Sequence, residues 1–282
     1  MGAPSEFFPT GHPEDIRDSI SLESYHLSKE QLDLLERGIV TEALGQHGDD
    51  SDVVALAVKG NDELANFGRT TETKTFTGYD FHHAMQSYEP FTTFVYTVDL
   101  GLSRVAHIKR AVGPKPKCER DTTGLTGIEV VDDRLTTELA REWVDLQTAL
   151  DHHGIGAADN CLNLTTNMAN KEVEPSRDKP YSLMSYKAMF ELGMAKGTTA
   201  FFAYLNRLAI KSLGRLDLQC DLLGGEEFHL PDPGSKTDYD QDYLAVVIPY
   251  NNHNINVFTV ANPDKPFTKL IANHHVPLYF SQ

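Results

Sequence analysis

The feature that most constrains the fold is a pair of alternating apolar segments with a very short connection. The segments TFVYTVDL (93–100) and RVAHIKRAV (104–112) are rich in β-branched and aromatic residues, and only GLS separates them. This pattern predicts an antiparallel β-hairpin. In the second segment, one face carries Ala106, Ile108, Arg110 and Val112, and the other carries Val105, His107, Lys109 and Ala111. Arg110 is therefore either an edge residue or a buried cation with a specific role.

The remaining periodicity predicts helices and strands in mixed order. Ser28 and Gln31 form a capping box that begins a helix in 27–48, and VVALAV (53–58) is typical of a buried strand. Further expected elements are a helix in 132–150, a helix, strand and helix in 181–216, strands in 243–250 and 256–260 with a turn at 251–254 between them, and a solvated loop over 224–242. This order favours an α/β (α+β) fold, with a mixed, mainly antiparallel central sheet flanked by helices. We expect residues 1–25 to form a polar N-terminal arm and residues 26–282 to form a single domain.

Composition excludes several classes of protein. Of the 282 residues, 40% are hydrophobic and 23% are charged, which is typical of a soluble globular chain. The net charge of −16 argues against a nucleic-acid or anionic-membrane surface. Because the chain shows neither a leader pattern nor a run of eighteen apolar residues, we expect it in the cytoplasm. The three cysteines, Cys118, Cys161 and Cys220, lack the spacing of a zinc site and predict no disulfide framework.

A local basic cluster stands out against this acidic background. Six cations but only one carboxylate, Glu119, lie between residues 104 and 120. Cations beside backbone amides bind phosphate through charge-assisted hydrogen bonds, so the cluster indicates a phosphate-bearing ligand. The alternative is a solvated strand and loop whose cations pair with nearby acidic surface. The cations are Arg104, Lys109, Arg110, Lys115, Lys117 and Arg120.

The order of elements resembles the GNAT acyltransferase superfamily, in particular the acyl-homoserine lactone synthases and N-acyl amino acid synthases. The resemblance rests on a helical start, a hairpin whose second strand ends in Arg110 and a Gly-Pro turn, and a later strand followed by YLNRLAIKSLGRLDLQCDLLG (204–224). In that branch, a strand reading roughly Gly-Thr-x-Arg precedes a phosphopantetheine-binding turn. Residues 107–110 keep its arginine but not its glycine. The resemblance implies that Lys109, Arg110, Gly113, Lys115, Lys117 and Asn206 bind the acyl donor.

Other positions depart from the family pattern. The segment TFTGYD (75–80) keeps Tyr79 and Asp80, but threonines replace the two earlier acidic residues. The tyrosine that protonates the leaving thiolate in many GNAT enzymes would fall near Leu213, which cannot do so. RAVGPKP (110–116) supplies only part of the phosphate-binding loop, because Pro114 lacks an amide N–H.

The function implied is transfer of an acyl group from acyl-CoA or an acyl carrier protein to the amine of a small molecule or amino acid, without a metal. Amide formation needs a base for the acceptor ammonium, and the candidates are Glu89, Asp99, Glu129 and His107. Two alternatives stay open. One is a non-catalytic member of this fold that binds a small molecule or a partner protein. The other is a metal-dependent hydrolase, for which ALDHHGIGAADN (149–160) supplies Asp151, His152, His153 and Asp159.

Overall fold

The computed structural model describes residues 26–48, 51–75, 89–113, 154–155, 160–176, 178–222, 228–230, 241–260, 264, 272 and 274–282, called the described residues below. One mixed sheet organises them, in the strand order β6-β8-β5-β4-β3-β2-β1-β9, with β7 paired to β8. The strands β4–β5 and β1–β9 are parallel pairs, and the other neighbours are antiparallel. The predicted mixed, mainly antiparallel sheet is thereby confirmed. The strands are β1 (Val53–Lys59), β2 (Thr92–Asp99), β3 (Arg104–Val112), β4 (Cys161–Ala169), β5 (Ala200–Leu205), β6 (Asp221–Leu222), β7 (Phe228–Leu230), β8 (Gln241–Pro249) and β9 (Leu278–Phe280).

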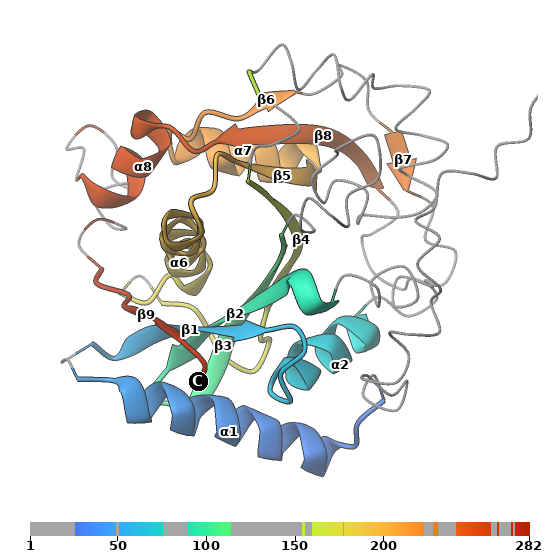
Figure 1. Ribbon diagram of the computed structural model, residues 1–282, viewed down its shortest axis with the longest axis vertical. Helices are drawn as coiled ribbons and strands as arrows, with labels where there is room; N and C mark the ends of the chain where they lie inside the picture. Colours follow the sequence, from blue (N-terminus) through green and yellow to red (C-terminus); the bar gives the residue numbers. More distant parts are fainter. Residues whose placement is uncertain are drawn as a thin grey trace, which may run out of the picture.

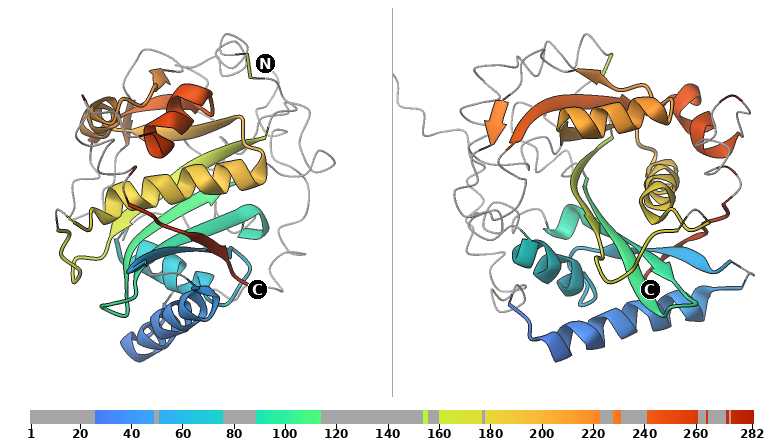
Figure 2. Two further views of the ribbon diagram at one scale, coloured as in Figure 1. Left: turned by 90° about the vertical axis from the view of Figure 1, so that its left-hand side faces the viewer. Right: turned by 180° about the vertical axis from the view of Figure 1, so that it is seen from behind.

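Helices cover both faces of this sheet (Figure 1). The helices α1 (Lys29–Gln46) and α2 (Ala65–Thr75) lie against one face of β1–β3, and α6 (Tyr181–Lys196) lies against the other. Strand alternation divides the core accordingly, because Leu56 packs with α1 and α2 whereas Ala55 packs with α6. The left view of Figure 2 shows α6 lying over the strands and running roughly along them. The remaining helical elements are α7 (Arg207–Arg215), α8 (Asn252–Thr259) and the 3₁₀ turn η2 (Glu89–Phe91).

Several sequence predictions are confirmed in detail. The Ser28 hydroxyl accepts from the Gln31 N–H, and the Gln31 side chain accepts from the Ser28 N–H, so the capping box begins α1. The predicted hairpin is the antiparallel pair β2 and β3. Strand β1 lies where it was expected, and 181–216 contains the predicted helix, strand and helix.

Two predictions near the C-terminus are wrong. Residues 256–260 were expected to form a strand after a turn, but they lie mainly in α8. The side chain of Asn251 accepts a hydrogen bond from the Asn254 N–H and caps this helix. Asn254 is itself buried, and its amide donates to the carbonyls of Gln219 and Pro249. The asparagines thus begin a helix, a role they fill as readily as a turn.

The expected loop over 224–242 also contains sheet. Phe228–Leu230 forms β7, and β8 begins at Gln241, so the two ends of the segment pair with each other as antiparallel strands. The predicted arm at 1–25 and the predicted helix at 132–150 lie outside the described residues. No helix among the described residues has both the length and the apolar character needed to cross a bilayer.

Candidate active site

The parallel strands β4 and β5 pair only at their beginnings. Cys161, Leu162 and Asn163 pair with 200–202, and no further register pair joins the two strands. Beyond this point β4 continues beside β3 and β5 continues beside β8, which belong to the lower and upper halves of the sheet in Figure 1. Over 164–169 and 203–205 the two strands therefore do not pair with each other. Strand edges that separate from each other can accept another extended chain between them.

The irregular part of β4 lies at the start of this separation. Ala111 pairs with Leu164 and Arg110 pairs with 166, so Thr165 is one extra residue on β4. Such a β-bulge takes the extra residue out of the ladder and redirects its backbone groups. The Thr165 hydroxyl is buried and has no hydrogen-bond partner among the described residues. Half-buried apolar side chains from both strands, Leu164 and Leu205, pack against the α6-side core nearby.

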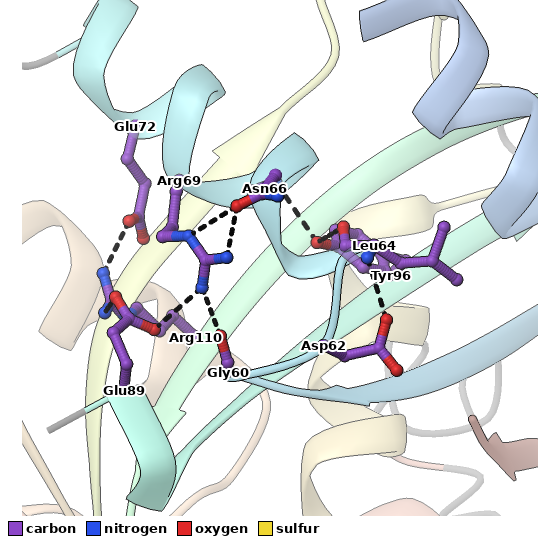
Figure 3. Close-up of polar contacts among 10 residues, drawn as sticks. Gly60, Asp62, Leu64, Asn66, Arg69, Glu72, Glu89, Tyr96 and Arg110 are labelled. Atoms are coloured by element: carbon purple, nitrogen blue, oxygen red, sulfur yellow. Dashed lines mark hydrogen bonds and ion pairs between the residues drawn. The ribbon is translucent and has the colours of Figure 1, made fainter. Parts of the chain in front are cut away.

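A buried network of charges lies on the α2 side of β3 (Figure 3). The Arg110 guanidinium is fully buried and donates to Glu72 at 2.7 Å and to Glu89 at 2.5 Å. Arg69, also buried, lies 3.2 Å from the other Glu89 oxygen and donates to the carbonyl of Gly60. Two cations and two carboxylates balance, and each guanidinium is held by elements far apart in the sequence. The network therefore holds α2, η2 and β3 together on the face of the sheet opposite α6.

A second set of polar side chains lies on the α6 side. Lys109 donates to the Asn167 side chain at 2.6 Å, and its ammonium lies 3.5 Å from the ring centroid of Tyr186 on α6. Burial lowers the pKa of Lys109 to about 7. Burial, with the nearby charge of Lys109, also holds the pKa of His107 well below its usual value, so its imidazole is neutral. The His107 Nδ1 and the Thr97 hydroxyl have no hydrogen-bond partner among the described residues.

Asp99 holds the N-terminal end of α6 against the sheet. Its carboxylate accepts from the Lys179 ammonium at 2.7 Å and from the Tyr181 hydroxyl at 2.6 Å, and its other oxygen accepts from the Leu102 N–H. Burial favours the protonated form of Asp99, but these hydrogen bonds outweigh it and lower its pKa. Asp99 is thus an ionised anchor.

The structure changes the interpretation of several predicted site residues. Arg110 already uses both terminal nitrogens on carboxylates, and no part of it is exposed to a phosphate. The Gly113 N–H donates to the carbonyl of Phe91 at 2.8 Å, so this amide is not free to bind one either. The Asn206 side chain accepts from the Ala209 N–H and caps α7. Glu89 balances Arg110, whereas Glu129, Lys115 and Lys117 lie outside the described residues.

Other site residues escaped sequence reasoning. Arg69 and Glu72 lie in a segment where no motif marked them, and Asn167 lies on a strand that was not predicted. The only sequence signal for Tyr186 was its position in a segment predicted to be an apolar helix. Their partners come from distant segments, so no local pattern could identify them. No group of three possible metal ligands occurs among the described residues, and Asp151, His152, His153 and Asp159 of the hydrolase alternative lie outside them.

No family model and no curated protein sequence matches the chain. Among solved structures it is similar to the CoA-dependent acyl-homoserine lactone synthase MesI, with 12% identity, a TM-score of 0.47, and 79% of this chain and 98% of that chain covered. It is also similar to FeeM, an N-acyl amino acid synthase from uncultured soil microbes, with 11% identity, a TM-score of 0.43, and coverage of 71% and 93%. A third is the mosquito arylalkylamine N-acetyltransferase like 5b, with 12% identity, a TM-score of 0.43, and coverage of 70% and 99%. These similarities concern the overall fold alone.

Proposed function

We propose that the protein is an acyltransferase that moves an acyl group from a pantetheine thioester to the amine of a small molecule or amino acid. The donor is acyl-CoA or an acyl carrier protein. The observation that carries the proposal is the separation of β4 from β5 after Asn163 and Phe202. An extended ligand with amide groups can lie between open strand edges and bond to them as an added strand does. A pantetheine arm has two amides on a linear chain, which suits an opening of this kind.

The bulge on β4 gives a place for the reacting carbonyl. When an amine attacks a thioester, negative charge develops on the carbonyl oxygen, and a fixed backbone N–H stabilises it. We assign this role to the Thr165 N–H, because the extra residue of a bulge is left out of the ladder. The thioester would then lie near the paired ends of the strands, with the arm extending outward along 164–169.

This direction changes where the phosphate of the donor would lie. An arm extending outward passes the end of β4 at Ala169 and reaches 170–180, the connection to α6. Lys171 is exposed on this connection, whereas Gly113 lies beside the start of β4, at the opposite end. We therefore assign phosphate recognition to the region around Lys171. Lys115 and Lys117 remain predictions.

Acid–base roles follow from which groups are already engaged. Glu89 and Asp99 form ion pairs with buried or half-buried cations. Accepting a proton would weaken these ion pairs, so neither carboxylate is suited to act as the base. Of the predicted bases, this leaves His107 and Glu129. The base that removes the ammonium proton must hydrogen-bond the acceptor nitrogen directly or through one water.

The experiment combines donor binding with turnover. Calorimetry would measure the binding of acetyl-CoA, a long-chain acyl-CoA and acyl carrier protein, and thiol release would report transfer to a panel of amines and amino acids. Leu205→Trp fills the opening from β5 and should abolish donor binding, whereas Leu208→Trp, on an exposed position of α7, should leave it unchanged. Circular dichroism would establish that both variants are folded. Wild-type protein that binds none of the three donors would refute the proposal.

A further inference from the structure

Three polar side chains meet on the face of the sheet that α6 covers. Thr97 on β2 is the register partner of His107 on β3, and it is also the partner of Ala55, which packs in the α6-side core. Lys109 lies two residues beyond His107 on the same face and contacts Tyr186 of α6. Residues two apart on a strand share one face and lie about 7 Å apart. The three side chains are therefore neighbours in one layer.

These groups are deeply buried, and their hydrogen-bonding capacity is only partly used. Thr97, His107 and Lys109 are 0%, 2% and 3% exposed. The Thr97 hydroxyl and the His107 Nδ1 have no partner among the described residues. The Lys109 ammonium has three N–H donors, and Asn167 accepts one of them. Buried polar groups are nearly always hydrogen-bonded, so unused donors in one place indicate a ligand or a water.

The charge of Lys109 is also unbalanced. None of the described carboxylates forms an ion pair with it. Asp99 lies on the same face, but Lys179 and the Tyr181 hydroxyl already hold it. Its ammonium contacts the side-chain amide of Asn167 and the ring of Tyr186. The lowered pKa of Lys109, near 7, has burial as its cause, with no anion to oppose it.

We propose that Thr97, His107 and Lys109 form a binding site for a carboxylate group of the substrate. The inference rests on the proposed acyltransferase function and narrows its substrate class. A carboxylate accepts about four hydrogen bonds, so it can take an N–H from Lys109, the Thr97 hydroxyl proton and the His107 Nδ1–H together. It would also supply the missing counter-charge. His107 then binds substrate rather than serving as the base.

The location fits a substrate group that enters from the separated strands. Asn167, the partner of Lys109, is exposed and lies on β4 within 164–169, beyond its pairing with β5. Tyr186, half-buried on α6, packs against the same core as Leu164 and Leu205. A carboxylate in this site belongs either to an amino acid acceptor or to the far end of the acyl group. Both sources present the same carboxylate group, and ligands that differ only in that group can distinguish them.

The test compares carboxylates with neutral partners of similar shape. Calorimetry on the full chain would use glycine, L-leucine and L-phenylalanine with their amides, and succinyl-CoA with butyryl-CoA. In wild-type protein, the carboxylate member of one pair should bind at least about tenfold more tightly. Lys109→Met should remove that difference, and Lys29→Met, at an exposed lysine that begins α1, should retain it. A preference among the amino acids would identify the acceptor as the source, and a preference for succinyl-CoA would identify the acyl group.

A second measurement separates binding from a merely structural role. The pKa of Lys109, followed by NMR of labelled lysine side chains, should rise when the preferred carboxylate binds and stay unchanged with its neutral partner. Two results would overturn the carboxylate site and leave the acyltransferase proposal intact. In the first, butyryl-CoA binds but no pair of ligands shows a preference for the carboxylate. In the second, the preference is still present in Lys109→Met. Water would then fill the site. No binding of either CoA ester or of acyl carrier protein would instead refute the proposed function.

Discussion

Replacing Arg110 tests whether the buried charge network holds the sheet and α2 together. In Arg110→Met, Glu72 and Glu89 lose donors at 2.7 and 2.5 Å, in a place where neither carboxylate is exposed. Removing one partner of a buried ion pair costs about 3–5 kcal/mol, because the remaining charge is uncompensated. Arg69 still lies 3.2 Å from Glu89, so we place the loss near the middle of that range, at about 4 kcal/mol. With roughly 2–4 °C per kcal/mol for a chain of this size, the melting temperature should fall by about 8–16 °C.

Urea unfolding followed by circular dichroism measures this loss, and a matched surface pair serves as the control. Glu172→Ala removes the exposed Arg104–Glu172 pair and should change stability little, because solvent screens exposed pairs. Adding Glu72→Gln to Arg110→Met should recover part of the loss, since it neutralises a stranded carboxylate. If the free energy of unfolding of Arg110→Met lies within about 1 kcal/mol of the wild-type value, the two carboxylates do not depend on the guanidinium. That result would contradict the large cost expected for removing one partner of a buried ion pair.

Further expected outcomes concern the sheet and its titrating groups. Val105→Asp places an unpaired carboxylate at a fully buried position of β3 and should leave the protein insoluble or unfolded; a soluble, cooperative variant would contradict the packing. Gly60→Ala brings a methyl to 2.2 Å from the Glu89 carbonyl oxygen and should lower the melting temperature by several degrees, whereas the open Gly45→Ala should not. Because its pKa is lowered on folding, Asp99 contributes stability above about pH 4 that is lost as the pH falls through the folded value, so Asp99→Asn should flatten acid unfolding curves measured in urea. Lys109 has a folded pKa of about 7, below its unfolded value, so the free-energy cost of burying its charge is fully present below pH 7. Lys109→Met should therefore be more stable than wild type below pH 7. The difference in unfolding free energy should disappear as the pH rises from 7 to about 10.

Much of the sheet could be predicted because its signals are local. Ser28 and Gln31 satisfy each other within one turn, and the hairpin of β2 and β3 combines alternation with a short connection. Strand β4 was missed because its sequence, CLNLTTNMA, mixes polar and apolar residues without clear alternation. Its bulge at Thr165 and its exposed Asn167 explain the irregularity.

The site was harder to predict, since its chemistry depends on contacts across the fold. Sequence reasoning selected Arg110 as an unusual cation and left open whether it was buried. Its burial and its two carboxylate partners depend on α2 and η2 folding over β3, which charge patterns could not show. Likewise, the prediction of phosphate binding at 113–117 came from the cluster of cations and from the family's turn after the strand of Arg110. The connection between the parallel strands β4 and β5, which contains α6, carried no comparable sequence signal.

Hydrogen–deuterium exchange with and without a tightly bound acyl-CoA tests the central claim most directly, because it reports backbone amides that lack ladder partners. We expect the donor to slow exchange in peptides covering 164–169 and 203–205, where β4 and β5 have separated. Peptides covering β3 should change little, since β3 is already paired on both edges. Unchanged exchange in both segments, with protection confined to another surface, would contradict the proposal that the opening between β4 and β5 holds the acyl donor.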